Sequence, residues 1–115
     1  MSTVTEKELD QFIGTTRYHR LTAVPMNCTD GVAYFAEKAN AFWLINDISI
    51  RCHYSEMKNE PFIVIKVTTH KNRAAAEYSD GNGKVLFVER YFMTDLEGNY
   101  TFYLTDNVLM LPSEY

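Results

Sequence analysis

The sequence predicts a single α+β domain over residues 1–115, with N-terminal helices packed on one face of a C-terminal antiparallel sheet of about four or five strands. Two observations predict it. Apolar residues recur at helical spacing up to about residue 52, and from Pro61 onward they alternate with polar residues as in strands. A chain of 115 residues, 46% of them hydrophobic, can bury one core and has no room for a second domain.

The residues before Pro25 predict one short helix and one extended segment. Thr5 and Glu8 have the spacing of a capping box that begins a helix, and Gly14 ends that helix. Residues 15–24 are rich in Thr, Tyr and Arg, which favours a strand or an ordered loop. Pro25 terminates this segment.

The central part of the chain predicts the helices that cover the sheet. A helix begins at Thr29 or Asp30, whose side-chain oxygens can accept hydrogen bonds from the first turn, and Asn40 stands where a left-handed residue would close it. Residues 41–52 then form a second helix or the second half of a bent one; both fit the spacing. The side chains that we expect to be buried against the sheet are Phe35, Phe42, Trp43 and Ile48.

The second half of the chain predicts strands joined by turns. Residues 80–83, Asp-Gly-Asn-Gly, give the strongest turn signal, because these residues tolerate the positive φ of a tight hairpin. We expect an antiparallel meander in which one face stays wet, with charged side chains at Lys66, Glu77, Glu89 and Arg90. A meander leaves two unpaired edges, through which the chain could form a homodimer. The predicted strands are residues 62–69, 73–79, 84–92, 99–105 and 107–111.

The net charge and the lack of targeting signals argue against binding to nucleic acid or membranes and against secretion. The net charge of −4 argues against general binding to nucleic acid or to anionic membranes. Residues 1–6 have neither the basic nor the apolar part of a secretory signal, and the apolar stretch 39–50 is interrupted and too short to span a bilayer. We therefore expect a cytoplasmic protein, in which Cys28 and Cys52 are thiols and not a disulfide.

No residue spacing indicates a cofactor, a metal ion or a catalytic centre. His19, His53 and His70 form no ligand pair with each other or with the cysteines, so we expect no metal. The glycine-rich segment 80–84 is explained by its hairpin and does not have the context of a phosphate-binding loop.

A small cysteine-dependent enzyme remains an alternative. Cys52 and His53 are neighbours in sequence and point in different directions, so they make no dyad, whereas Cys28 with His19 is sterically conceivable. We expect both cysteines to be buried, non-catalytic residues.

A second alternative is a nucleic-acid-binding accessory protein. Arg17, Tyr18, His19 and Arg20 form a basic and aromatic cluster that could contact a phosphate backbone and stack on a base. The competing interpretation is a solvated loop.

The preferred site is an acidic and aromatic surface in the last quarter of the chain. Residues 91–115 contain four acidic residues, six aromatic residues and no Lys or Arg. Acids among aromatic side chains can form a face for a basic protein partner, since tyrosine gives contact area at low entropic cost. We expect acids at opposite ends of the strand 99–105, with one exposed tyrosine between them. The predicted partner-binding residues are Asp95, Glu97, Tyr103 and Asp106.

Several segments resemble an uncharacterised family of small proteins from bacteriophages, plasmids and other bacterial mobile elements. The likeness lies in residues 29–45, in 12–15 with 18–20, and in 111–115. The family pattern has Gly where this chain has Asn40, which suits a left-handed helix end. No catalytic residue or cofactor comes with the family. The resemblance implies an accessory protein in a bacterial cell, and many such proteins, anti-CRISPR proteins among them, bind a host defence protein. It implies a non-enzymatic inhibitor of a host defence complex.

Overall fold

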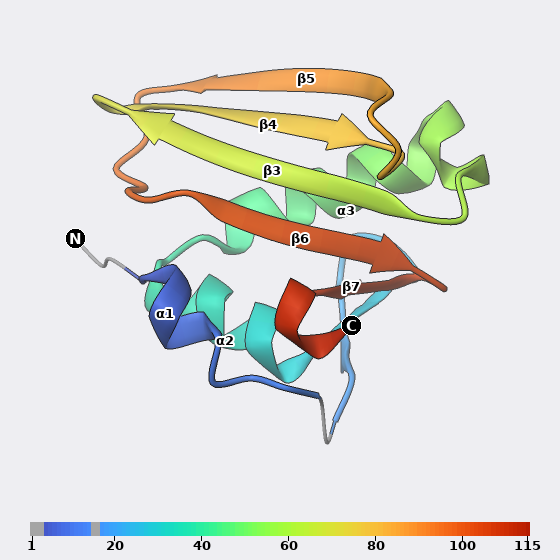
Figure 1. Cartoon of the computed structure of the whole chain (residues 1–115), viewed down its shortest axis with the longest axis horizontal. Helices are drawn as coiled ribbons and strands as arrows, with labels where there is room; N and C mark the ends of the chain where they lie inside the picture. The colour runs from blue at the N-terminus through green and yellow to red at the C-terminus, as the bar shows by residue number, and fades with distance from the viewer. Residues whose placement is uncertain (1–3, 15–16) are drawn as a thin grey trace.

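The computed structural model describes residues 4–14 and 17–115 and shows an α+β domain built on one mixed sheet (Figure 1). The helices are α1 (Glu6–Leu9), α2 (Asp30–Lys38) and α3 (Phe42–Tyr54), and the single-turn 3₁₀ helices are η1 (Glu56–Asn59) and η2 (Pro112–Glu114). The strands are β1 (His19–Arg20), β2 (Asn27–Cys28), β3 (Ile63–His70), β4 (Arg73–Ser79), β5 (Val85–Phe92), β6 (Tyr100–Thr105) and β7 (Val108–Met110).

The strand order corrects the predicted meander. In the described residues, seven strands form one sheet in the order β1-β2-β7-β6-β3-β4-β5, so the expected count of four or five was too low. Strands β3, β4 and β5 do follow one another as hairpins, but β6 returns across the molecule to pair with the free edge of β3 and not with β5. β7 pairs in parallel with β2, which brings the segment before α2 into the sheet.

Turn chemistry explains the hairpins. The β3–β4 turn places Lys71 and Asn72 at positive φ (47° and 66°), and the β6–β7 turn does the same with Asp106 and Asn107 (52° and 61°). Two consecutive residues with positive φ match the right-handed twist of the strands that such a turn joins. The predicted turn at residues 80–83 is confirmed as the β4–β5 hairpin.

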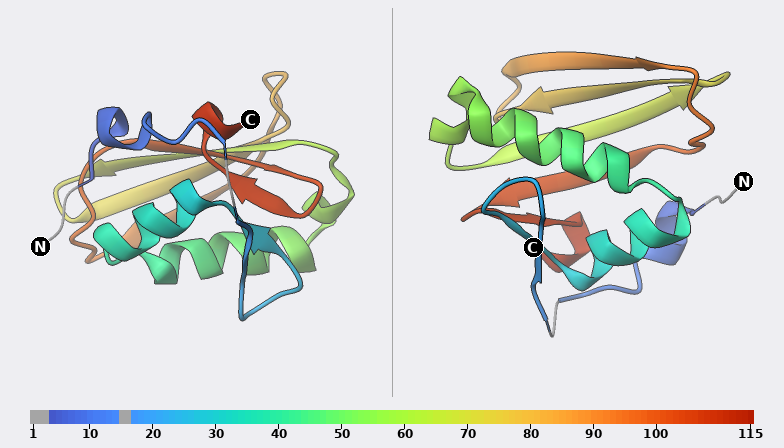
Figure 2. Two further views of the ribbon diagram at one scale, coloured as in Figure 1. Left: turned by 90° about the horizontal axis from the view of Figure 1, so that it is seen from below. Right: turned by 180° about the vertical axis from the view of Figure 1, so that it is seen from behind.

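Helices α2 and α3 cover one face of the sheet, as predicted, whereas the first helix, α1, lies on the opposite face, which corrects the expectation that the N-terminal helices share one face (Figure 2). Thr29 caps α2 by accepting the N–H of Val32, and Asn40 has φ 52°, the left-handed conformation expected of it, so the two segments are separate helices. We call this covered side of the sheet the helix face and the opposite side the front face. The predicted first helix is only the four residues of α1, and Thr15 and Thr16 of the predicted segment 15–24 lie outside the described residues.

Two of the four predicted core residues were placed wrongly. Phe35 and Ile48 are fully buried, but Phe42 is 51% exposed and Trp43 is 39% exposed. The reason is that α3 turns one face to the sheet, with Leu44, Ile45, Ile48 and Cys52, while residues 42 and 43 project from other sides of the helix. The ring of Trp43 instead packs edge-on against Tyr91 of β5, at a centroid distance of 5.3 Å.

Strand alternation divides the remaining side chains between core and front face. Tyr100, Phe102 and Leu104 of β6 are buried, while Tyr103 lies on the front face. Lys66, Glu77 and Arg90 are exposed as predicted; Glu89 is a correction, because it points to the helix face and forms an ion pair with Arg51 of α3.

The segment around η2 is tied to the start of α2 by one carboxylate. Glu114 accepts hydrogen bonds from the Thr29 hydroxyl (2.5 Å), the Gly31 N–H (3.1 Å) and the Leu111 N–H (3.0 Å). Anionic groups are favourable at a helix N-terminus, where N–H groups have no partner within the helix. We call this arrangement the Glu114 clamp.

Candidate functional site

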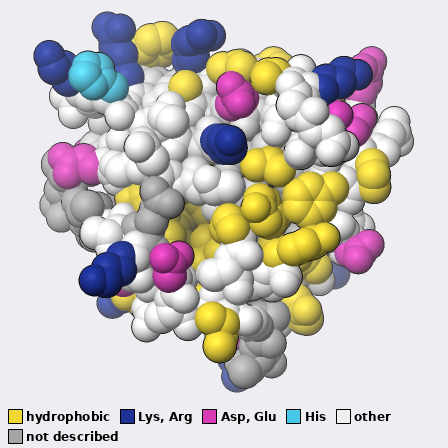
Figure 3. All heavy atoms as spheres, viewed as in Figure 1, with side chains coloured by type: hydrophobic (Ala, Val, Ile, Leu, Met, Phe, Trp, Pro, Cys, Tyr) yellow, Lys and Arg dark blue, Asp and Glu magenta, His cyan; other side chains and the backbone are white. Residues whose placement is uncertain are grey.

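The front face carries three aromatic side chains that pack on one another. Phe62, Tyr103 and Tyr115 have ring centroids 5.1, 5.3 and 5.7 Å apart, and we call them the aromatic cluster. Tyr103 is half-buried within the cluster, and Tyr115 is 75% exposed. Hydrophobic side chains gather on this part of the front face (Figure 3). Of the predicted site residues, Tyr103 therefore lies in an accessible aromatic surface.

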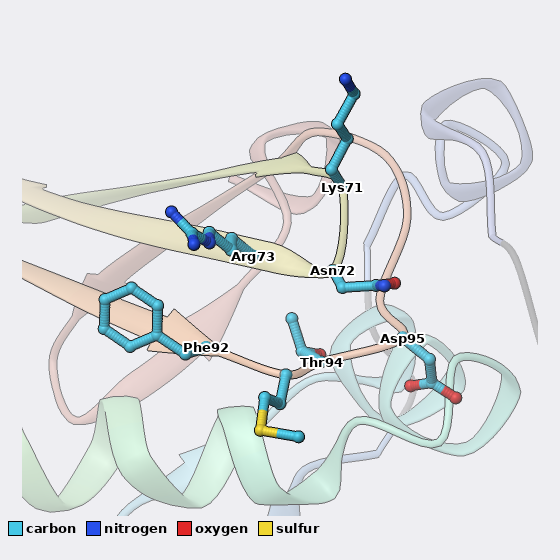
Figure 4. Close-up of a pocket in the computed structure, with 7 residues that line it drawn as sticks. Lys71, Asn72, Arg73, Phe92, Thr94 and Asp95 are labelled. Atoms are coloured by element: carbon cyan, nitrogen blue, oxygen red, sulfur yellow. The ribbon is translucent and has the colours of Figure 1, made fainter.

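The predicted acids lie beyond the two ends of strand β6 and not against Tyr103. Asp106 is exposed in the β6–β7 turn, whereas Asp95 and Glu97 are exposed in the loop before the other end of β6. The two groups are thus at opposite ends of the strand, as expected. Asp95 faces a hollow that it shares with Lys71 and with residues of the β4–β5 strand pair, so its surroundings are mixed in charge (Figure 4).

A groove of about 300 Å³ runs beside Tyr103 on the front face. One wall is formed by Leu9 at the end of α1 and by Asp10, which follows it, and the other by Pro112 and Ser113 of η2. Tyr103 belongs to the aromatic cluster and also lines the groove, so a partner that contacts its ring can also enter the groove.

A second surface, which was not among the predicted sites although His70, Lys71 and Arg73 are close in sequence, lies at the far corner of the front face. His70, Lys71, Arg73 and Arg90 gather there around exposed Phe92, and we call these four basic residues the basic corner. Strand register explains it: His70 lies opposite Arg73, which in turn lies opposite Phe92, and Ala75 lies opposite Arg90. Basic side chains and a histidine are visible at this corner in Figure 3. The guanidinium of Arg73 lies 5.5 Å from the ring centre of Phe92.

The basic segment Arg17–Arg20 forms no such corner. Tyr18 is 60% exposed and Arg20 is exposed at the sheet edge, but the ring of His19 is turned to α2, where its Nε2 lies 2.8 Å from Asp30. Of the four residues predicted to contact a nucleic acid, His19 is therefore already held by a carboxylate.

The two cysteines are buried free thiols. Burial, together with the nearby carboxylates of Glu114 and Asp30, raises the pKa of Cys28 to about 11, and burial raises the pKa of Cys52 to about 12. Cys28 lies opposite His19 in the β1–β2 register, yet a thiol with so high a pKa stays protonated at neutral pH and is a weak nucleophile.

No group of three or more His, Cys, Asp and Glu side chains is placed to hold a metal ion in the residues that the structure describes. His19, His53 and His70 lie on β1, α3 and β3, in three separate parts of the fold. Nor is any helix within 4–14 and 17–115 long and apolar enough to cross a bilayer.

The fold and its surfaces define a small α+β domain with a helix-covered core and a front face that α1 and η2 cover only in part. The chain belongs to DUF6876, a family of unknown function, whose model matches residues 3–115. This match confirms the expectation, drawn from the sequence resemblance, that the chain belongs to an uncharacterised family. No curated protein and no solved structure matches the chain.

Proposed function

We propose that this protein is a non-enzymatic binding module that contacts another protein through its front face. The observation that carries the proposal is the aromatic cluster of Phe62, Tyr103 and Tyr115. Tyrosine rings exposed beside a groove are typical of the residues that dominate binding energy at protein interfaces. Helices α2 and α3 cover the opposite face, so a partner reaches these rings without rearranging the core.

A partner with a basic surface fits the charges around the cluster. Asp106 stands at one end of β6, and Asp95 and Glu97 precede the other end. The net charge of −4 adds a long-range attraction to such a partner. The acids steer and orient the complex in this proposal, and the tyrosines supply most of its affinity.

The biological setting that we propose is a mobile genetic element in a bacterium, with a host defence protein as the partner. This setting is supported by the resemblance of residues 29–45 and 111–115 to small proteins of phages and plasmids. Inhibition of a defence complex, as anti-CRISPR proteins achieve it, is the specific form of the proposal.

The test is capture of partners from a bacterial lysate with immobilised protein, followed by mass spectrometry and by affinity measurement with the purified partner. The double variant Tyr103→Ala, Tyr115→Ala should lose the partner while keeping a folded circular dichroism spectrum. Tyr54→Ala is the matched control, because Tyr54 is an exposed tyrosine on α3, away from the front face. Equal binding by the double variant and the wild type would refute the aromatic cluster as the interface.

A separate variant tests the acids. Reversing Asp95, Glu97 and Asp106 to Lys should slow association with a basic partner and reduce the salt dependence of the rate. An association rate that does not change would show that these acids only make the surface soluble.

A further inference from the structure

Among residues 4–14 and 17–115, strand β5 ends the sheet and pairs with β4 alone, so its outer side has no partner strand there. It is eight residues long and contains no proline, whereas the strand at the other edge, β1, has only two residues. An antiparallel edge strand directs the N–H and C=O of every second residue outward, where a further strand can bind them. The outer edge of β5 therefore offers a template for another extended chain.

The two faces beside this edge differ in charge. On the helix face, Glu89 is paired with Arg51 and the Tyr91 hydroxyl donates a hydrogen bond to Asp47, so the charge of Glu89 is neutralised there. On the front face, Arg90 takes part in no ion pair with any residue of 4–14 or 17–115, and Arg73 stands diagonally beside it on β4. The unneutralised charge along β5 is thus positive and lies on one face only.

Exposed apolar side chains surround the carboxyl end of the same strand. Phe92 is 64% exposed and Met93 is 94% exposed, and both belong to the hollow shown in Figure 4. Met93 also has φ 62°, a conformation that a non-glycine residue adopts at a cost in free energy. On the helix side, Trp43 lines a second hollow together with Phe92 and Met93. An exposed apolar group of this kind is typical of an interaction surface.

We propose that the free edge of β5 binds an extended segment of a partner protein, which adds a strand to the sheet. The segment alternates in character: a carboxylate lies on the front face beside Arg90, and apolar side chains lie on the helix side, beside Phe87 and Trp43. The backbone hydrogen bonds of an added strand supply affinity, and the alternate side chains supply specificity. This site is separate from the aromatic cluster, so it stands whether or not that cluster binds a partner.

A second copy of the chain fits this edge less well. In antiparallel pairing, residues opposite one another point to the same face of the sheet. Glu89 and Arg90 point to opposite faces, so no antiparallel register of two β5 strands places a Glu89 carboxylate opposite Arg90. The charge on Arg90 therefore favours an acidic segment from a different protein.

The binding test uses a synthetic peptide with a fluorescent label, acetyl-Ser-Val-Glu-Val-Glu-Val-Ser-amide, and a twin with Lys in place of both Glu residues. Fluorescence anisotropy should show binding of the acidic peptide and much weaker binding of the basic one. The variant Arg90→Glu should weaken binding of the acidic peptide about tenfold or more and should improve binding of the basic peptide. Arg20→Glu, at an exposed arginine on β1, is the matched control and should leave both affinities unchanged.

Hydrogen exchange locates the peptide on the protein. The acidic peptide should slow exchange at alternate amides of β5, and a peptide with Pro at the central Val should bind no better than the basic twin. This proline control does not depend on the folding of any protein variant. Absence of β5 protection, or an Arg90→Glu variant that binds both peptides as the wild type does, would overturn the proposal.

Two other results would assign the edge to a different occupant and would also overturn the proposal. One is a dimer, detected by sedimentation, whose formation protects the β5 amides and is unaffected by the acidic peptide. The other is binding of a single-stranded oligothymidylate that requires Arg90 and that the acidic peptide does not displace.

Discussion

Replacing Gly31 with alanine should destabilise the fold by about 2 kcal/mol, although alanine is ordinarily the better helix former by up to about 1 kcal/mol. Gly31 is in the first turn of α2, directly under the Glu114 clamp. A Cβ atom at this position would lie 2.5 Å from Leu111 Cδ1 and 2.6 Å from Glu114 Oε1. Leu111 is buried and cannot move into solvent, so the added methyl group must displace the carboxylate.

The magnitude follows from two losses of stability and two partial offsets. Overpacking of this kind costs about 1–3 kcal/mol, and a weakened hydrogen bond to a charged acceptor costs about 1.5–3 kcal/mol. Relaxation of the η2 segment recovers part of both, and the helix propensity of alanine offsets about 1 kcal/mol. A net loss of about 2 kcal/mol remains.

The assay is urea unfolding followed by the fluorescence of Trp43, the single tryptophan. With a denaturant slope of about 1.5 kcal/mol/M for a chain of this size, the midpoint should fall by about 1.3 M. Glu114→Ala removes the clashing carboxylate, so in that background Gly31→Ala should cost less than it does in the wild type. Additive losses, or a Gly31→Ala variant as stable as the wild type, would refute the close packing of η2 on α2.

Three further predictions concern the buried thiols and the exposed tryptophan. Burial raises the pKa of Cys28 to about 11 and that of Cys52 to about 12. Iodoacetamide at pH 7.5, followed by mass spectrometry, should therefore modify the native protein far more slowly than the urea-unfolded chain. Fast modification of the native protein would contradict this burial. Because the pKa of Cys52 is raised from its ordinary value of 9.0, the protonated thiol stabilises the fold fully below pH 9, and this contribution is lost as the pH rises toward 12. The melting temperature should therefore fall above pH 9, and it should fall less steeply in the variant Cys52→Ala. Trp43→Ala should lower the free energy of unfolding by about 1 kcal/mol, because the ring is 39% exposed and contacts Tyr91 at its edge. The measurement is circular dichroism during urea unfolding, and a loss above about 3 kcal/mol would mean that Trp43 occupies a core position.

Local signals in the sequence predicted the local structure well. Asn40 ends α2 in the left-handed conformation, Thr29 caps that helix, and the segment 73–79 is strand β4 to the residue. Each depends on a few neighbouring residues, whose preferences for turns and caps are set by short-range geometry. The alternation in 99–105 also separated Tyr103 from the buried side chains of β6.

Long-range pairing was not predictable in the same way. β2 and β7 have two and three residues, too few to show a period, yet their parallel pairing joins the β1–β2 pair to the rest of the sheet. The return of β6 to β3 likewise depends on which edge gives the larger buried core, and no residue in β6 encodes that choice. The basic corner is partly local, since His70, Lys71 and Arg73 flank the β3–β4 turn, and only Arg90 joins them through strand register.

The Glu114 clamp has a consequence for the order in which the chain folds during its synthesis. The hairpins β3–β4 and β4–β5 join neighbouring segments and can form as soon as residues 63–92 have left the ribosome. Thr29 and Gly31, although made much earlier, receive their hydrogen-bond acceptor only when Glu114 arrives. The nascent chain therefore carries α2 without its anchor until translation has passed residue 114, and a ribosome-bound fragment that stops at β6 exposes the apolar surface that β7 and η2 later cover.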